Sequence, residues 1–135
     1  DPPQRLAALA RLAYERAARG TDPHSGVLAA ASDPQVGPVL ERVTEKRLVF
    51  LERLYRDLGL PSDEARRHSR LSYAVYLGIG ALRQAAPQSE PGGPDLDAYL
   101  DLAVQTLLEA ARRSAGGQPR PRGTADRTRH HRRPE

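Results

Sequence analysis

The chain has 135 residues, 39% of them hydrophobic, and contains no cysteine. This length fits one domain with a single core, and the lack of cysteine excludes disulfides, thiolate metal sites and cysteine nucleophiles. No run of about 18 apolar residues is present, so we expect no membrane span, and no signal peptide is recognisable.

The charge is unevenly distributed along the chain. Residues 1–114 hold 15 basic and 15 acidic side chains, so the net charge of +4 comes from residues 115–135, with six arginines and two acids. Net charge therefore gives no support for nucleic-acid binding by residues 1–114.

The first predicted helix begins at residues 1–2, an N-cap followed by a proline, and ends at Gly20. A loop over 21–26 leads to a short apolar helix over 27–31, which the Asp-Pro pair at 33–34 terminates. The apolar stripe of the first helix contains Leu6, Leu9, Ala10, Ala13 and Ala17.

The third helix is predicted over about 34–58 and is closed by Gly59. The fourth helix follows, with Ser62 or Asp63 as its N-cap, and ends near 86–87. The apolar face of the third helix contains Val36, Val39, Leu40, Val43, Phe50, Leu51, Leu54 and Leu58.

A loop rich in proline, glycine and serine over 87–94 precedes the fifth helix, which Asp95 caps. After Ser114 the sequence has no apolar period, so we expect residues 115–135 to form a disordered basic tail. No strand pattern is present. The sequence predicts an all-α bundle of five helices, four long and one short, over residues 1–114.

The fourth and fifth helices have more apolar surface than one small bundle can bury. At 100° per residue, one face of the fourth helix holds Leu71, Val75, Gly78, Ile79 and Leu82, with Tyr73 and Leu77 nearly opposite. The apolar residues of the fifth helix cover about half of its circumference, with Leu102 outside that half. A helix that is apolar on two sides is central or shared with a partner, so we expect a homodimer. The residues predicted at its interface are Tyr73, Leu77, Ala81, Tyr99, Leu102 and Leu107.

Arg47 is the strongest candidate for a binding residue, because it lies near the centre of the apolar stripe of the third helix. A buried guanidinium needs a partner. That partner is either a ligand with a carboxylate, phosphate or polar oxygen, or an internal acid; alternatively the side chain reaches past the rim of the core. The predicted ligand contacts are Arg47, Phe50, Leu54, His68 and Ser72, with Val75 as a wall.

Four further side chains have both a functional and a structural interpretation. His68 is a hydrogen-bonding group in a cavity, a proton switch or a half-exposed residue of a first helical turn. His24 is either a cover for the cavity mouth or an ordinary loop residue. Tyr14 and Tyr55 border apolar stripes, where a tyrosine either forms an amphipathic rim or contacts a ligand.

Catalytic patterns are missing from the sequence. There is no glycine-rich phosphate loop, no nucleophile elbow and no zinc-protease motif, so we expect neither an enzyme nor a metal site or cofactor. Asp97 and Asp101 lie on the polar face of the fifth helix, where a solvated acidic ridge is the simplest interpretation. His130 and His131 lie among the tail arginines, which either contact nucleic acid or acidic lipid or form only a soluble end. The tail has no aromatic residue that could stack on bases.

The order of elements resembles the C-terminal regulatory domain of TetR-family transcriptional regulators, over roughly residues 3–112. The more specific parts are the helix entry at 26–28, the break at 33–34 and the turn DLGLPSDEAR. The resemblance implies that the last two helices pair with their copies in a second subunit. It also implies that the first four helices enclose a small-molecule cavity whose occupancy is coupled to DNA binding, as in a cytoplasmic repressor.

One departure from the family is large. The family reads DNA with an N-terminal helix-turn-helix, and nothing in these 135 residues resembles it. We therefore expect a fragment of a regulator that contacts DNA only through a segment not present here. The alternative is a stand-alone helical homodimer that binds or scaffolds without DNA.

Overall fold

The computed structural model describes residues 1–22 and 30–117 of the chain. Predictions that fall on the other residues, including the short second helix, His24 and most of the basic tail, lie outside the described part. The described residues form four α-helices, a 3-10 turn and no strand, which confirms the all-α class. The elements are α1 (Pro2–Arg19), α3 (Gly37–Asp57), α4 (Ser62–Ala85), η2 (Pro87–Ser89) and α5 (Pro94–Gly116).

Glycines end or follow two of the helices, as the sequence predicts. Gly20 follows α1 with φ 68° and ψ 21°, a left-handed conformation that favours glycine. Its N–H donates to the carbonyl of Ala17, so one of the terminal carbonyls of α1 is satisfied. Gly59 has φ 98° in the short connection between α3 and α4.

The N-termini of α4 and α5 correct the predicted caps. Pro61, in an extended conformation, holds the N-cap position of α4, and Gly93 holds that of α5. Ser62 and Asp63 are therefore inside the first turn of α4, and Asp95 is inside that of α5. The acids still interact favourably with the positive ends of the helix dipoles, without a side-chain cap bond.

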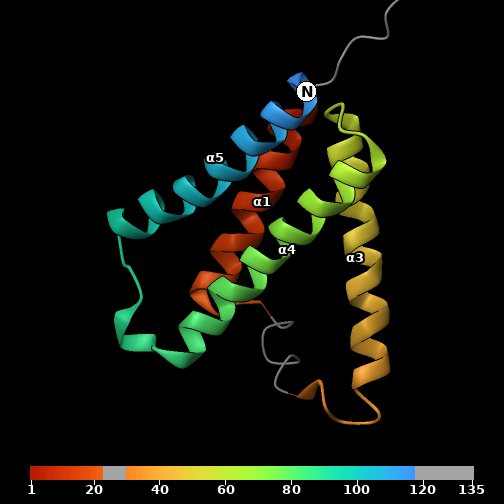
Figure 1. The fold of residues 1–135 in the computed structure, drawn as a ribbon. Coiled ribbons are helices and arrows are strands. Elements are labelled where there is room, and N and C mark those ends of the chain that lie inside the picture. The colour runs from red at the N-terminus through yellow and green to blue at the C-terminus, as the bar shows by residue number, and fades with distance from the viewer. Residues whose placement is uncertain (23–29, 118–135) are drawn as a thin grey trace, which may run out of the picture.

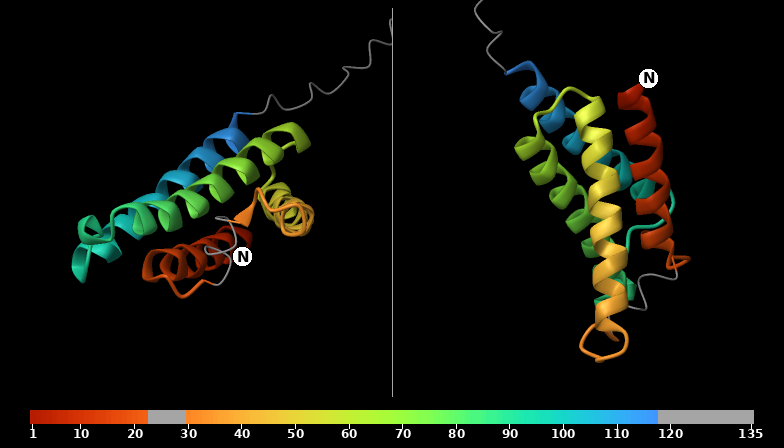
Figure 2. Two further views of the ribbon diagram at one scale, coloured as in Figure 1. Left: turned by 90° about the horizontal axis from the view of Figure 1, so that it is seen from below. Right: turned by 90° about the vertical axis from the view of Figure 1, so that its right-hand side faces the viewer.

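The helices form two layers. Figure 2 (left) shows α4 and α5 side by side, with α1 and α3 on the same side of this pair. In Figure 1, α4 runs between α3 and α5 across the middle of the molecule, with α1 behind it. Since α1 and α3 both pack on one side of the α4–α5 layer, no described element covers its other side.

The core lies where α1, α4 and α5 meet and extends to the C-terminal half of α3. Leu100 and Tyr55 are the largest of its fully buried apolar side chains. Leu6, Tyr14 and Ala17 bring α1 into this core. No described helix is long and apolar enough to cross a bilayer.

The face of α4 that enters the core is not the one with most leucines. Of the five residues that the helical wheel groups together, only Ile79 is buried, whereas Leu71 and Leu82 are 51% and 58% exposed. Tyr73 and Tyr76 point into the core instead, with rings 5.5 Å apart.

Hydrogen bonds explain this orientation of α4. The hydroxyl of Ser69 donates to the carbonyl of Leu48 on α3 at 2.7 Å. The hydroxyl of Tyr14 on α1 donates to the carbonyl of Ser72 at 2.8 Å. Polar side chains are buried at little cost when they are hydrogen-bonded, and serine is small enough to let neighbouring helices approach closely. The tyrosine and serine face of α4 therefore packs inward, and its leucine and alanine face remains outside.

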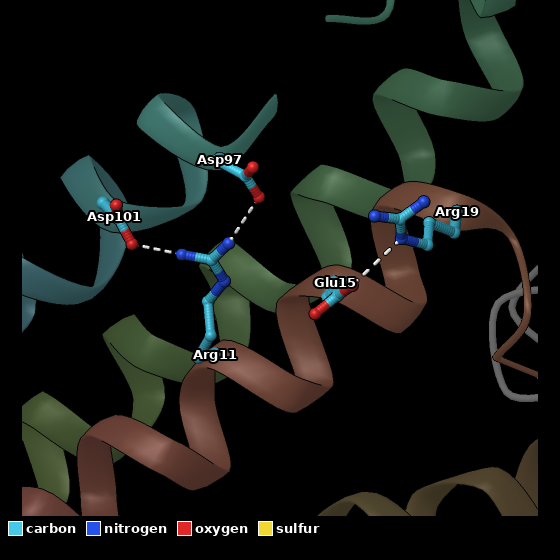
Figure 3. Close-up of polar contacts among 5 residues, drawn as sticks. All are labelled: Arg11, Glu15, Arg19, Asp97 and Asp101. Carbon is cyan, nitrogen blue, oxygen red and sulfur yellow. Dashed lines mark hydrogen bonds and ion pairs between the residues drawn. The ribbon is translucent and has the colours of Figure 1, made fainter. Parts of the chain in front are cut away.

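An ion-pair clamp joins α1 to α5 on the surface. Arg11 on α1 contacts Asp97 at 2.8 Å and also the carboxylate of Asp101, one turn further along α5 (Figure 3). The sequence predicted a solvated acidic ridge here. The two acids are largely exposed, but both are paired with one guanidinium from a different helix.

Candidate functional site

A cavity of about 260 Å³ opens between α1, α3 and α4. It is partly enclosed by the three helices and partly open to solvent. Its volume is slightly below the range of roughly 300–1,000 Å³ usual for sites that bind drug-sized ligands. The described residues that line it are Leu6, Leu9, Ala10, Ala13, Tyr14, Arg16, Asp22, Arg47, Phe50, Leu51, Ser72, Tyr73 and Tyr76.

The α1 side of the cavity is an apolar wall. Leu9, Ala10 and Ala13 are only partly buried, although they lie on the inward stripe of α1. Their accessible surface faces the cavity, so a ligand with an apolar body would remove it from water. Across from this wall, α3 contributes Leu51, half-buried, and Phe50, which is exposed at the mouth.

The hydroxyl groups of Ser72 and Tyr14 in the cavity both donate hydrogen bonds to carbonyls of α4. The hydroxyl of Ser72 donates to the carbonyl of Ser69 within α4 at 3.0 Å. The hydroxyl of Tyr14 donates to the carbonyl of Ser72, and this bond fixes α1 against α4. Because both donors are already engaged, these two side chains offer a ligand acceptor atoms only.

Burial keeps the phenols in this region neutral. Desolvation raises the pKa of Tyr14 well above its usual value, and the nearby Tyr55 phenol raises it further. Desolvation also raises the pKa of Tyr55, partly offset by a hydrogen bond with Ser72. Both phenols are therefore uncharged at neutral pH, and the charged groups of the site are those of Arg16, Asp22 and Arg47.

Arg47 lies on the α3 wall and is half-buried. No described residue forms an ion pair or hydrogen bond with its guanidinium, so the internal ion pair considered from the sequence is absent from the described part of the chain. Its partial exposure fits a side chain that reaches along the apolar wall toward the rim. The guanidinium is therefore available to a ligand.

Three of the six predicted ligand contacts line the cavity: Arg47, Phe50 and Ser72. The other three do not line it. Leu54 is 7% exposed and belongs to the core, and Val75 is partly buried against that core without lining the cavity.

His68 lies outside the cavity and is not half-exposed, so neither the cavity-lining nor the half-exposed interpretation describes it. It is 9% exposed, with its ring 5.4 Å from that of Tyr55. Its Nε2 atom lies 3.0 Å from the hydroxyl of Ser114 on α5, and its Nδ1 atom has no hydrogen-bond partner in the described part of the chain. His68 therefore joins α3, α4 and α5 near the end of the bundle.

Sequence reasoning missed most of the α1 wall and two of the aromatic residues. Tyr73 was predicted at the dimer interface, but its ring lines the cavity together with Tyr76. Tyr14 was considered either a rim residue or a ligand contact; it is 2% exposed and lines the cavity. The available signal was the run of serine and tyrosine on one face of α4, because buried hydroxyls need partners on neighbouring helices.

Among the described residues, no group of three or more histidine, cysteine, aspartate or glutamate side chains could hold a metal ion. Among the described residues that line the cavity, Asp22 provides one carboxylate, and Arg16 and Arg47 provide two guanidinium groups. Such a set of charged groups, with an apolar wall and neutral hydroxyls, can bind and orient a small molecule.

Comparison of the chain with protein-family profiles, curated proteins and solved structures gave no match.

Proposed function

We propose that this chain is the ligand-sensing and dimerisation domain of a TetR-like transcriptional regulator, with a repressor in the cytoplasm as the simplest case. A small molecule binds in the cavity, and its binding changes how two copies of the domain are arranged. DNA contact is assigned to a helix-turn-helix segment outside these 135 residues. The observation that carries the proposal is that α4 has the cavity on one side and an uncovered apolar surface on the other.

That uncovered surface, here called the outer face, spans α4 and α5. Its large apolar side chains are Leu71, Leu82 and Leu102, which are 51%, 58% and 65% exposed. Between the two leucines of α4 lies Gly78, where an added Cβ atom would meet nothing within 4 Å. Exposed leucines around small residues on a helix pair are typical of a surface that another protein covers. The alanines exposed on the same side of α4 are Ala74, Ala81 and Ala85.

The size of the outer face fits a second copy of the chain. Helices of 24 and 23 residues are each about 35 Å long and about 10 Å wide, so the pair presents roughly 700 Å². A standard protein interface buries about 800 Å² on each partner. Two such pairs meeting about a twofold axis would form a four-helix interface.

The structure changes the predicted interface at two positions. Tyr73 and Leu107 are 7% and 6% exposed, because they pack within their own chain, and we remove them from the proposed contact. The retained positions are Leu77, Ala81, Tyr99 and Leu102, to which the exposure of α4 adds Leu71 and Leu82.

The most direct route from the cavity to the interface runs through α4, because this helix contributes residues to both. Ser72, Tyr73 and Tyr76 line the cavity, and Leu71 and Gly78 lie on the outer face of the same two turns. A ligand that displaces these cavity residues must move α4, and the outer face moves with it. Such a shift biases the arrangement of two subunits, which is the physical basis of a coupled sensor.

The test is the mass of the intact full-length chain under native conditions, for the wild type and two variants. Leu71→Glu combined with Leu102→Glu places charges on the outer face and should give a monomer. Leu12→Glu is the control, because Leu12 is 50% exposed on α1, away from the outer face. The proposal expects a dimer for the wild type and the control, whereas a monomeric wild type or a dimeric double variant would contradict it.

A further inference from the structure

We propose that the cavity between α1, α3 and α4 takes a small apolar monoanion, with its carboxylate bound by Arg47 and its hydrocarbon body against the α1 wall. This inference rests on the proposed ligand-binding function and adds the chemical class of the ligand. It is carried by the distribution of charge, hydrogen-bond donors and apolar surface in and around the cavity.

Charge is the first argument. The cavity contains the guanidinium groups of Arg16 and Arg47 and one carboxylate, from Asp22. Residues 1–114 as a whole have no net charge, so this local surplus of positive charge is a property of the site. Arg47 is the half-buried one of the two arginines and has no acidic partner among the described residues. A carboxylate would satisfy it with two parallel hydrogen bonds.

The surface outside the mouth of the cavity also has an excess of positive charge. Phe50 lines both the cavity and a shallow groove along the outside of α3. Three cations, Arg42, Lys46 and Arg53, and one acid, Glu45, line that groove. An excess of one charge around an opening raises the local concentration of ligands with the opposite charge, so an anion is favoured before it enters.

The interior of the cavity determines the polarity and size of the part of the ligand that carries no charge. The α1 wall is apolar, and the hydroxyl protons of Tyr14 and Ser72 are already donated to carbonyls of α4. A sugar or another polyol would lose its hydrogen bonds to water without sufficient replacement. The volume of about 260 Å³ limits the body to a compact ring system or a short chain.

An organic cation is the main rival, because four aromatic rings line the cavity: Tyr14, Phe50, Tyr73 and Tyr76. Aromatic faces attract cations through the negative potential of the ring. Two guanidinium groups against one carboxylate oppose a further positive charge in the same space. The charge balance therefore favours the anion, and a cationic probe tests this choice directly.

The experiment uses three probes with the same naphthalene ring system: 2-naphthoate, 2-naphthalenemethanol and 2-naphthylmethylamine. Each is titrated calorimetrically into the full-length chain, into Arg47→Gln, and into Arg56→Gln as a control, because Arg56 is an exposed residue of the same helix that lines neither the cavity nor the groove. Charge-assisted hydrogen bonds of this kind are worth about 10-fold to 100-fold in affinity. The naphthoate should therefore bind at least about 10-fold more tightly than the other two probes to the wild type and to Arg56→Gln. Arg47→Gln should lose this preference, and Arg47→Lys should keep part of it, since it retains the charge but not the planar fork.

A further variant, Ala13→Phe, fills the cavity from the α1 wall and should abolish binding of the naphthoate. If the alcohol or the amine binds as tightly as the acid, or if Arg47→Gln keeps the preference, the anionic class is overturned. If a probe binds the wild type but not Ala13→Phe, the cavity is still shown to be a ligand site, and only the anionic class of the ligand is wrong. If none of the three probes binds, the inference fails, and the proposed function is judged separately by the dimer test.

Discussion

Replacing Tyr14 with phenylalanine should weaken the fold slightly at neutral pH and also make it less sensitive to alkali. The hydroxyl of Tyr14 donates to the carbonyl of Ser72 at 2.8 Å from a side chain that is 2% exposed. A buried hydrogen bond of this type contributes about 0.5–1.5 kcal/mol to the free energy of unfolding. The carbonyl of Ser72 also lies within α4, where it is free to accept the helical N–H, so we expect a loss near the lower end of this range.

The alkaline effect follows from the raised pKa values of Tyr14 and Tyr55. The unfolded chain releases these protons from about pH 10 upward, whereas the folded chain retains them. The stability that comes from the neutral phenols is therefore complete below about pH 10 and falls as the pH rises beyond it. Each retained proton lowers the free energy of unfolding by about 1.4 kcal/mol per pH unit, so removal of one of the two phenols should halve this contribution to the slope.

Urea unfolding followed by far-UV circular dichroism, from about pH 8 to about pH 12, measures both effects. Tyr55→Phe should reduce the alkaline slope in the same way, and the double variant should lose both contributions. An unchanged slope for Tyr14→Phe would mean that its phenol ionises as readily in the folded chain as in the unfolded one. The account of a buried, neutral hydroxyl cluster would then be refuted.

Three further predictions concern the scaffold. Leu100→Ala removes the largest fully buried aliphatic side chain of α5 and should lower the free energy of unfolding by about 2–5 kcal/mol in chemical denaturation. Gly20→Ala should lower the free energy of unfolding by about 1–2 kcal/mol, because φ is 68° and an added Cβ atom would overlap the guanidinium of Arg83. The control Gly116→Ala, where an added Cβ atom meets open space, should lower it by less than about 0.5 kcal/mol. Arg11→Ala opens the clamp to the two α5 carboxylates and should cost less than about 1 kcal/mol, with a smaller difference from wild type in high salt, since all three groups are partly exposed. A salt-independent loss of several kcal/mol would contradict the last of these.

Periodicity and turn residues were enough to predict the helices themselves. Gly20 ends α1 in a left-handed conformation and the proline after Ala86 follows the end of α4, as expected from the sequence. These features are local, because a glycine or a proline limits the backbone whatever packs against it. The caps of α4 and α5 were missed by one or two residues because backbone positions rather than side-chain bonds define those ends.

The orientation of α4 could not be predicted from apolar periodicity. A wheel that scores leucine as inside and serine as outside places Leu71 in the core, whereas the structure buries Ser69 and Ser72. The deciding interactions are hydrogen bonds to Leu48 on α3 and from Tyr14 on α1, which depend on helices far away in the sequence. The candidate site was therefore half predicted: Arg47, Phe50 and Ser72 were found, but the wall supplied by α1 was not.

The position of α4 between the cavity and the outer face leads to a final prediction about linkage. If ligand binding changes the dimer dissociation constant by some factor, dimerisation must change the ligand affinity of each subunit through the same free energy. Naphthoate should therefore bind the wild type and the Leu71→Glu/Leu102→Glu monomer with different affinities, although neither leucine lines the cavity. The Leu12→Glu variant should match the wild type, since it alters an exposed leucine on α1 outside the outer face. Equal affinities for dimer and monomer would show that α4 transmits nothing between its two faces, and the chain would then bind a ligand and a second copy independently.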